Sequence, residues 1–286
     1  MAVSQAIPTR YWKVRLDVFL PYVLVHLGCL GVFWTGLTRT GILVCLVSYY
    51  VRQFALGVGY HRYFAHRSFK TSRAMQFVLA LVGSLCLQRG PLWWAETHRH
   101  HHRFVDTPED IHSPKYQGFW YAHAGWFMDQ KNWRTNFSKV ADLKKFPELV
   151  WLDDWRCHEL LQILYAASLY FLFGWEGLVW GFMVSTVLLW HSTHWIQSIS
   201  HKYGGYRRYP TRDDSRNHWL LGLLTLGEFH HNHHCFPSSC RQGLAWWEVD
   251  FNYYILRAMS WLGLVWELRT PAEHTRREMV RGSESG

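Results

Sequence analysis

Residues 96–104 read ETHRHHHRF, a stretch that places four histidines within five positions. An α-helix turns by about 100° per residue, so positions i, i+3 and i+4 share one face. His98, His101 and His102 have this spacing, whereas His100 would point away from that face. The stretch therefore predicts a helix that presents three histidines together.

The same spacing recurs in residues 228–236, which read EFHHNHHCF. His230, His233 and His234 repeat the i, i+3, i+4 pattern, and His231 is the member that would point away. Two such triples in one chain are far less expected by chance than a lone histidine, so we interpret both as ligand groups.

An earlier pair lies in GYHRYFAHRSF, where His61 and His66 are five residues apart. Five residues correspond to about 140° on an α-helix, so these side chains would not share a face well. We expect them either to serve two different metal ions or to flank the point where a helix ends. His201, in WIQSISHKYGG, is a ninth candidate.

Nine histidines in this arrangement predict a centre with two metal ions. Neutral imidazole is the commonest metal ligand, and a structural zinc site closes with four ligands, so nine are too many for one ion. All-nitrogen ligation suits iron, copper or zinc, and ligand type alone does not choose among them. His112, His191 and His194 lie close to the groups and stay open, and no ligand role is expected for the remaining candidates His26, His123, His158, His218 and His274.

Carboxylates are expected beside these histidines, because a metal-bound imidazole usually donates its other N–H to a carboxylate. Glu228 is the first choice, since it lies two residues before His230. The nearby acidic residues are Glu96, Asp106, Glu109, Asp110, Asp213 and Asp214, and the preferred partners are Glu228, Asp110, Asp214 and Glu96.

Four apolar stretches are close to the roughly 20 residues that a helix needs to cross a bilayer. They predict spans over residues 18–36, 41–60, 156–174 and 177–198. A fifth stretch, 74–88, separates two histidine groups, which would lie on opposite faces of the membrane if it crossed. We therefore expect it to lie in the interface. The sequence predicts an all-α integral membrane protein, in which four transmembrane helices carry a cytoplasmic helical cap that holds the metals.

Charge sets the expected orientation. The formal net charge is +9, and the amino end carries Arg10, Lys13 and Arg15, while the turn after the first span has only Arg39. By the positive-inside rule, both termini and the histidine groups are cytoplasmic. Anionic lipids account for the basic excess, and nothing resembles a nucleic-acid groove. Residues 1–286 read as a single domain with a disordered tail over 271–286.

At these histidines the sequence resembles the membrane-bound fatty-acid desaturase family, most closely its Δ9 acyl-CoA (stearoyl-CoA desaturase-like) branch. That family carries H-x-x-x-x-H, H-x-x-H-H and H-x-x-H-H in this order, and GYHRYFAHRSF, THRHHHRF and GEFHHNHHCFP look like its text. The resemblance extends from about Tyr50 to Leu268. It implies two iron ions that use O2 to place a cis double bond, at Δ9, in a saturated acyl chain. Electrons would come from an external carrier resembling cytochrome b5, a ferredoxin or a rubredoxin.

The resemblance also implies a substrate tunnel. Gln88, Trp94 and Thr193 match the residues that bend the tunnel in the family, and Tyr49 and Cys45 would set its depth. Gln197 stands where the family has an asparagine that holds a water on one iron.

The substrate headgroup is left open by the sequence. Coenzyme A is the first choice, and a carrier protein or a glycerolipid is an alternative. The basic residues compatible with coenzyme A phosphates are Arg89, Arg134, Lys144, Lys145, Arg207 and Arg208.

Two rival functions remain at this stage. A membrane di-iron hydroxylase acting on an alkane, sterol or carotenoid would use similar histidines. A metal transporter or sensor is a more remote alternative, because such proteins place ligands within the spans or in histidine tracts.

Overall fold

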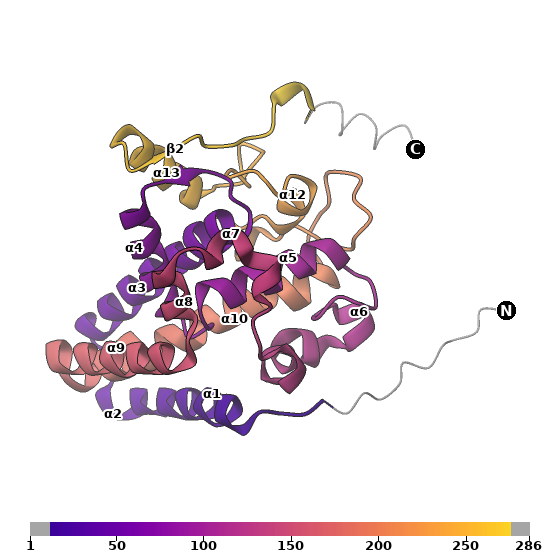
Figure 1. Cartoon of the computed structure of the whole chain (residues 1–286). Helices are drawn as coiled ribbons and strands as arrows, with labels where there is room; N and C mark the ends of the chain where they lie inside the picture. The colour runs from indigo at the N-terminus through magenta and orange to yellow at the C-terminus, as the bar shows by residue number, and fades with distance from the viewer. Residues whose placement is uncertain (1–11, 276–286) are drawn as a thin grey trace.

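The computed structural model describes residues 12–275, which are mostly helical (Figure 1). Figure 1 shows α1, α2, α3 and α9 gathered at the left and bottom, with α12 and α13 above them and α5 and α6 to the right. Two short strands, β1 (Lys70–Thr71) and β2 (Val265–Trp266), pair antiparallel. In chain order the helices are α1 (Leu16–Gly28), η1 (Cys29–Gly31), α2 (Val32–Thr35), α3 (Arg39–Phe54), η2 (Ala55–Ala65), α4 (Arg73–Ser84), α5 (Pro91–Phe104), α6 (Pro114–Gln117), η3 (Tyr121–Gly125), η4 (Trp126–Met128), η5 (Gln130–Asn132), η6 (Phe137–Val140), α7 (Ala141–Lys144), α8 (Pro147–Asp153), α9 (Trp155–Glu176), η7 (Gly177–Val184), α10 (Ser185–Ser198), η8 (Ile199–His201), α11 (Trp219–Leu224), α12 (His230–Cys235) and α13 (Phe251–Trp261).

Three helical runs of the described chain are long and apolar enough to cross a membrane. They are Leu16–Thr35, Arg39–Ala65 and Trp155–His201. The first run has only 6% of its apolar window buried, so most of its apolar side chains point outward, as they would in lipid. These runs coincide with the stretches that hydropathy identifies in the sequence.

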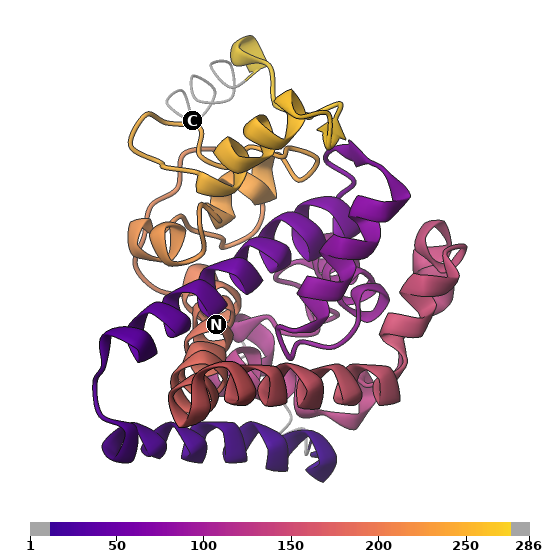
Figure 2. The ribbon, with the colours of Figure 1, turned by 90° about the vertical axis from the view of Figure 1, so that its left-hand side faces the viewer.

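The third run has 47 residues and is interrupted at Gly174. Gly174 has φ 62° and ψ −148°, a conformation that glycine adopts without steric cost. The chain folds back there, because Gly177 packs directly against the backbone of Leu169 on α9. The packing is so close that a Cβ atom at Gly177 would collide with the Leu169 carbonyl oxygen. Residues before and after Gly174 therefore form two helices, as the predicted spans 156–174 and 177–198 require. Figure 2 shows α9 running above α1.

Helix α4 is the short apolar helix expected between two histidine groups. Its 12 residues extend about 18 Å, whereas a bilayer core is about 30 Å thick. The helix ends at Ser84 rather than at residue 88, and Leu87 (φ 54°) and Arg89 (φ 66°) have left-handed backbone conformations. Gln88 lies between them, so an irregular turn presents this side chain.

The second apolar helix continues past the predicted end at residue 60, as a π-helix over Ala55–Ala65. All 11 residues of this segment are buried. The hydrogen bond from the His66 amide to the His61 carbonyl spans five residues, at 3.2 Å. A π-helix aligns residues five apart, and His61 and His66 therefore lie on one side of the helix. The prediction that they would not share a face was therefore wrong, whereas the helix does end at this pair, with His66 as its C-cap.

The tail predicted to be disordered, 271–286, is described only to Thr275. Residues 273–275 are helical, and 276–286 lie outside the described part, as does Arg10 of the basic amino end.

Candidate metal centre

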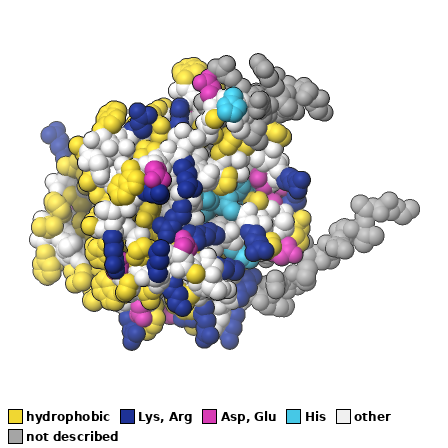
Figure 3. Space-filling model, turned by 45° about the horizontal axis from the view of Figure 1, so that its top comes forward, with side chains coloured by type: hydrophobic (Ala, Val, Ile, Leu, Met, Phe, Trp, Pro, Cys, Tyr) yellow, Lys and Arg dark blue, Asp and Glu magenta, His cyan; other side chains and the backbone are white. Residues whose placement is uncertain are grey.

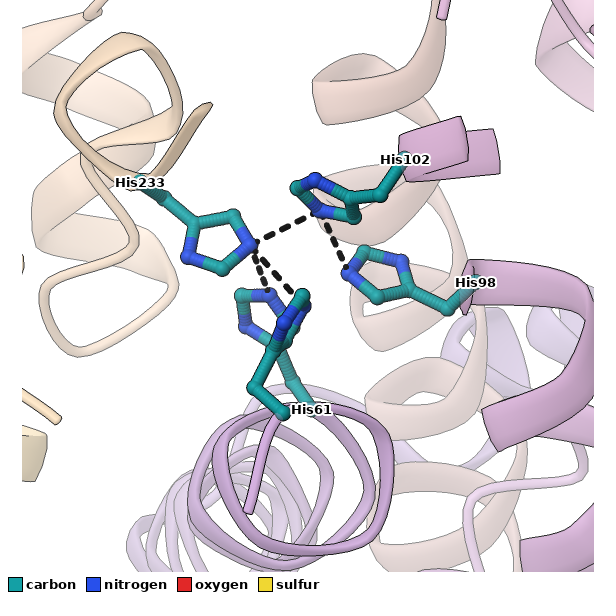
Figure 4. A group of neighbouring side chains, drawn as sticks. His61, His98, His102 and His233 are labelled. Carbon is teal, nitrogen blue, oxygen red and sulfur yellow. Dashed lines mark hydrogen bonds between the residues drawn. The ribbon is translucent and has the colours of Figure 1, made fainter. Parts of the chain in front are cut away.

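Nine histidines converge in two groups, and they are the nine that the sequence singles out. Within each group the ligand nitrogens lie within 4.8 Å of one another. Figure 4 shows four members of the first group, which point toward one another from three segments of the chain. Group A is His61, His66, His98, His102 and His233, and group B is His101, His201, His230 and His234.

Each H-x-x-H-H triple is divided between the two groups, although its spacing predicts one shared site. His98 and His102, four apart on α5, belong to group A, while His101 belongs to group B. Helix α12 does the reverse: His230 and His234 belong to group B, and His233 reaches group A. Two short helices facing one another thus each supply ligands to both groups.

The imidazole nitrogens lie at the spacing expected for ligands of a common ion. In group A, His233 Nε2 is 2.9 Å from His61 Nε2, 3.1 Å from His66 Nε2 and 2.9 Å from His102 Nε2. Two nitrogens about 2.1 Å from one ion, at right angles, are about 3 Å apart. His233 can donate at most one proton to these three neighbours, so hydrogen bonds alone cannot account for the cluster.

Three buried carboxylates fix how the imidazoles are protonated. His61 Nδ1 donates to Glu228 Oε2 at 2.5 Å, and His101 Nδ1 lies 3.1 Å from both oxygens of Asp110. In group B, His201 Nδ1 donates to Asp106 at 2.9 Å.

An ionised carboxylate only accepts hydrogen bonds, so each of these rings carries its proton on Nδ1. Each Nε2 is then a bare lone pair. His201 Nε2 lies 2.6 Å from His230 Nε2, and His101 Nε2 is buried without a hydrogen-bond partner in the described structure. His234 Nε2 is likewise buried without a hydrogen-bond partner in the described residues. Orphaned ring nitrogens are unfavourable without a cation, so these residues fit two metal ions.

Burial keeps six of the nine histidines neutral, and Arg62 keeps the Glu228 carboxylate charged. Burial, followed by neighbouring imidazoles, lowers the pKa of His98, His102 and His233 well below the usual value. Burial raises the pKa of Glu228, but Arg62 and His61 outweigh it and lower that pKa to about 2. Neutral imidazole beside an ionised partner is the state that binds metal.

A cavity of about 380 Å³ lies against this centre, between α1, α9 and α10. Trp94 and Gln197 line both this cavity and a smaller one that reaches His61, His98, His101 and His230. The three predicted bend residues form a hydrogen-bonded set: Gln88 Nε2 donates to Thr193 Oγ1 at 3.2 Å, and Trp94 Nε1 donates to Gln88 Oε1 at 3.3 Å. Trp94 also stacks on His98, with ring centroids 4.8 Å apart. Gln88, Thr193 and Trp94 thus form a rigid polar corner beside the histidines, and a molecule in the cavity would pass it.

Comparison with known proteins agrees with this geometry. Residues 37–266 match the fatty acid desaturase family. The chain belongs to the fatty acid desaturase family. It is 37% identical to a Delta-9 acyl-lipid desaturase of Arabidopsis thaliana, over 97% of this chain and 91% of that protein. It is also 37% identical to an acyl-CoA 5-desaturase of Anemone leveillei (94% and 84% of the two chains) and to an sn-2 palmitoyl-lipid 9-desaturase of Nostoc sp. (81% and 80%). The protein is thus an oxidoreductase that acts on fatty acyl chains.

Two preferred carboxylates of this desaturase pair with lysines rather than with histidines of the two groups. Asp214 pairs with Lys115 at 2.9 Å, and Glu96 pairs with Lys139 at 3.0 Å. Asp213 instead lies 3.5 Å from His234 Nδ1, and Asp106 contacts His201. Sequence proximity was not a sufficient guide, because loop folding decides which of two adjacent acidic side chains turns inward.

Gln197 also has a partner that the sequence did not suggest. Its Oε1 accepts a hydrogen bond from Trp126 Nε1 at 3.0 Å. The side chain still lines both cavities.

Tyr49 and Cys45, expected to set the tunnel depth, line neither cavity. Both are buried, and the Tyr49 hydroxyl donates to the Leu224 carbonyl at 2.9 Å. The inner walls of the larger cavity are instead formed by Val25, Ala166, Phe182 and Met183.

A buried arginine beneath the desaturase centre was not predicted from the sequence. Arg62, fully buried, contacts Glu228 Oε1 at 3.0 Å and Asp250 at 3.0 Å. Asn252 Nδ2 donates to the same Glu228 oxygen at 3.0 Å. These contacts hold the Glu228 carboxylate that orients His61. The position of Arg62, directly after His61 on an apolar helix, was the available signal.

Proposed function

We propose that this desaturase binds two iron ions, one in each histidine group, and uses O2 to introduce a cis double bond, at Δ9, into a saturated acyl chain. Two adjacent methylenes each lose one hydrogen, and two electrons from an external carrier with two protons complete the reduction of O2 to two waters. The pair of irons supplies the oxidant that an unactivated C–H bond requires. The observation that carries the proposal is the convergence of nine imidazoles beside the Gln88–Thr193–Trp94 corner.

The protein's own residues account for positioning. Glu228, Asp110 and Asp106 hold His61, His101 and His201 with Nε2 directed inward. The corner fixes where an acyl chain bends, and therefore which methylenes lie beside the groups. Such fixed geometry is worth orders of magnitude in rate, and it restricts the reaction to one pair of carbons.

The membrane arrangement we propose has four crossings, because Gly174 divides the third apolar run into two helices. Both termini and both histidine groups then lie on the cytoplasmic side. Figure 3 shows hydrophobic side chains gathered at the left and histidines reaching the surface between lysine and arginine side chains. That face is accessible to the external electron carrier, of cytochrome b5, ferredoxin or rubredoxin type.

The cavity favours an acyl-lipid over acyl-CoA as the substrate. Of the six basic residues proposed for coenzyme A, only Arg89 lines it, and the Arg89 guanidinium packs 3.8 Å from the ring centre of Trp133. Asp17, Asp153 and Glu159 line the same cavity, which disfavours a polyanionic headgroup. Leu24 and Ile163, 62% and 65% exposed, line its outer wall, so it faces the surrounding lipid.

Expression in a host that lacks unsaturated lipids tests the proposal. The expected result is a new cis double bond at carbon 9, located by mass spectrometry, and its absence with full iron loading would contradict the proposed reaction. In membranes given isotope-labelled acyl-CoA or labelled glycerolipid, we expect the lipid-bound chain to be desaturated first. Direct desaturation of acyl-CoA would overturn the headgroup assignment alone. A product that retains oxygen from labelled O2 would indicate the hydroxylase alternative, and metal flux in vesicles without any product would indicate a transporter.

A further inference from the structure

A third histidine group lies outside the two groups of the desaturase centre. His123 comes from η3, and His191 and His194, three residues apart, come from α10. Their ligand nitrogens also lie within 4.8 Å of one another, and we name these three residues group C. Neither the desaturase reaction nor the cavity corner uses this group.

Hydrogen bonds around group C fix the protonation of two of its rings. His26 Nδ1 donates to the Tyr22 carbonyl at 2.7 Å, so His26 Nε2 is an acceptor. His191 Nε2 lies 3.0 Å from that nitrogen and must donate to it, which leaves His191 Nδ1 bare.

On the other side, the Ser198 hydroxyl donates to the His194 carbonyl at 2.9 Å, so it can only accept from His123 Nδ1, at 3.0 Å. His123 Nε2 is then bare, and it lies 3.0 Å from the bare His191 Nδ1. Two bare ring nitrogens of group C therefore face one another.

The third member adds an independent observation. His194 is 4% exposed, and its Nδ1 is buried without a hydrogen-bond partner in the described structure. An unpaired buried polar nitrogen is costly. Ionisable side chains on membrane-spanning helices usually face a functional site. His123 itself stays neutral at physiological pH, since burial and then His191 lower its pKa to about 4.

We propose that His123, His191 and His194 bind one divalent transition-metal ion, of the zinc class, separate from the two irons. Three neutral imidazoles with one open position form a familiar zinc ligand set. His26 and Ser198 would act as outer partners, since each hydrogen-bonds the ring nitrogen opposite the ion. The bound ion would fasten η3 to α10 at the wall of the larger cavity, which His194 lines.

The experiment counts metal in the full-length protein. Protein purified in detergent is stripped with chelator, loaded with Zn²⁺, gel-filtered and analysed by plasma mass spectrometry. We expect about three zinc ions per chain in the wild type, and about two in His123→Gln and in His191→Gln. His158→Gln is the matched control, because His158 is also buried with an unpartnered Nδ1 but belongs to no histidine group of the described chain. It should keep about three.

A wild-type count of about two, or an unchanged count in both variants, would overturn the proposal. Ser198 would then donate to His123 instead, and group C would be a hydrogen-bonded chain without metal. If the substitutions prevent folding, zinc-edge anomalous scattering from wild-type crystals decides. A peak between the three imidazoles supports the site, and peaks confined to groups A and B contradict it.

Discussion

Glu228→Gln is expected to weaken iron binding in group A while leaving the overall size of the side chain unchanged. In the wild type, Glu228 Oε2 accepts from His61 Nδ1, and Oε1 accepts from Arg62 and Asn252. A glutamine has one acceptor oxygen and one NH₂ donor, so a donor must face either His61 or Arg62. If it faces His61, the imidazole proton moves to Nε2 and the metal-binding lone pair is lost.

The size of this effect follows from the loss of one outer hydrogen bond to a metal ligand. Such losses typically weaken metal binding by about 10–100-fold, or about 1.4–2.7 kcal/mol. Arg62 keeps Asp250 and the Cys240 carbonyl. Its charge therefore remains compensated, and we expect the variant to fold.

The assay is iron retention by the purified protein against a graded series of chelator concentrations. Asp214→Asn is the matched control, because it makes the same carboxylate-to-amide change at a side chain that pairs with Lys115. The Glu228→Gln protein should lose about one of its two irons at a chelator concentration about 10–100-fold lower than the Asp214→Asn control requires. Equal retention by the two variants would refute the reasoning that Glu228 orients His61.

Three further predictions follow from the same contacts. Asp106→Asn replaces the ionised acceptor for His201 with a neutral amide and should weaken iron binding in group B by about 10–100-fold, measured by the same titration, with group A unchanged. Loss of both irons together would contradict separate groups. Thr193→Val removes the acceptor for the Gln88 amide, a hydrogen bond worth about 1 kcal/mol. The share of product with the double bond at other positions should therefore rise several-fold, and a single product isomer by mass spectrometry would refute this role. Metal-free protein should melt at progressively lower temperature as the pH falls below about 6.5. Burial lowers the pKa of six of the nine histidines, so the unfolded chain binds more protons there. A melting temperature constant from pH 7 to 5 would count against buried, neutral ligands.

The sequence predicted which nine histidines converge but not how they divide. Spacing identifies residues on one face of a helix, and His98, His101 and His102 do share α5. Their distribution depends on where α12 lies against that helix, which is a tertiary relation. His61 and His66 could not be placed because their helix is π rather than α, and the backbone hydrogen-bond register is not evident from side-chain identities.

The remaining differences have similar causes. Group C was not predicted from the sequence, because His123 and His191 are far apart in the chain and match no spaced motif. Apolar composition identified the three described helical runs that are long enough to cross a membrane, since hydropathy is a local property. Asp214 and Glu96 were misplaced, because the direction of a loop side chain depends on packing around it.

Iron-edge anomalous scattering from crystals of the iron-loaded protein tests the central claim most directly. Two peaks are expected, one among His61, His66, His98, His102 and His233 and the other among His101, His201, His230 and His234. A single peak, or iron bound elsewhere with the two groups vacant, would contradict a dinuclear centre built from these imidazoles.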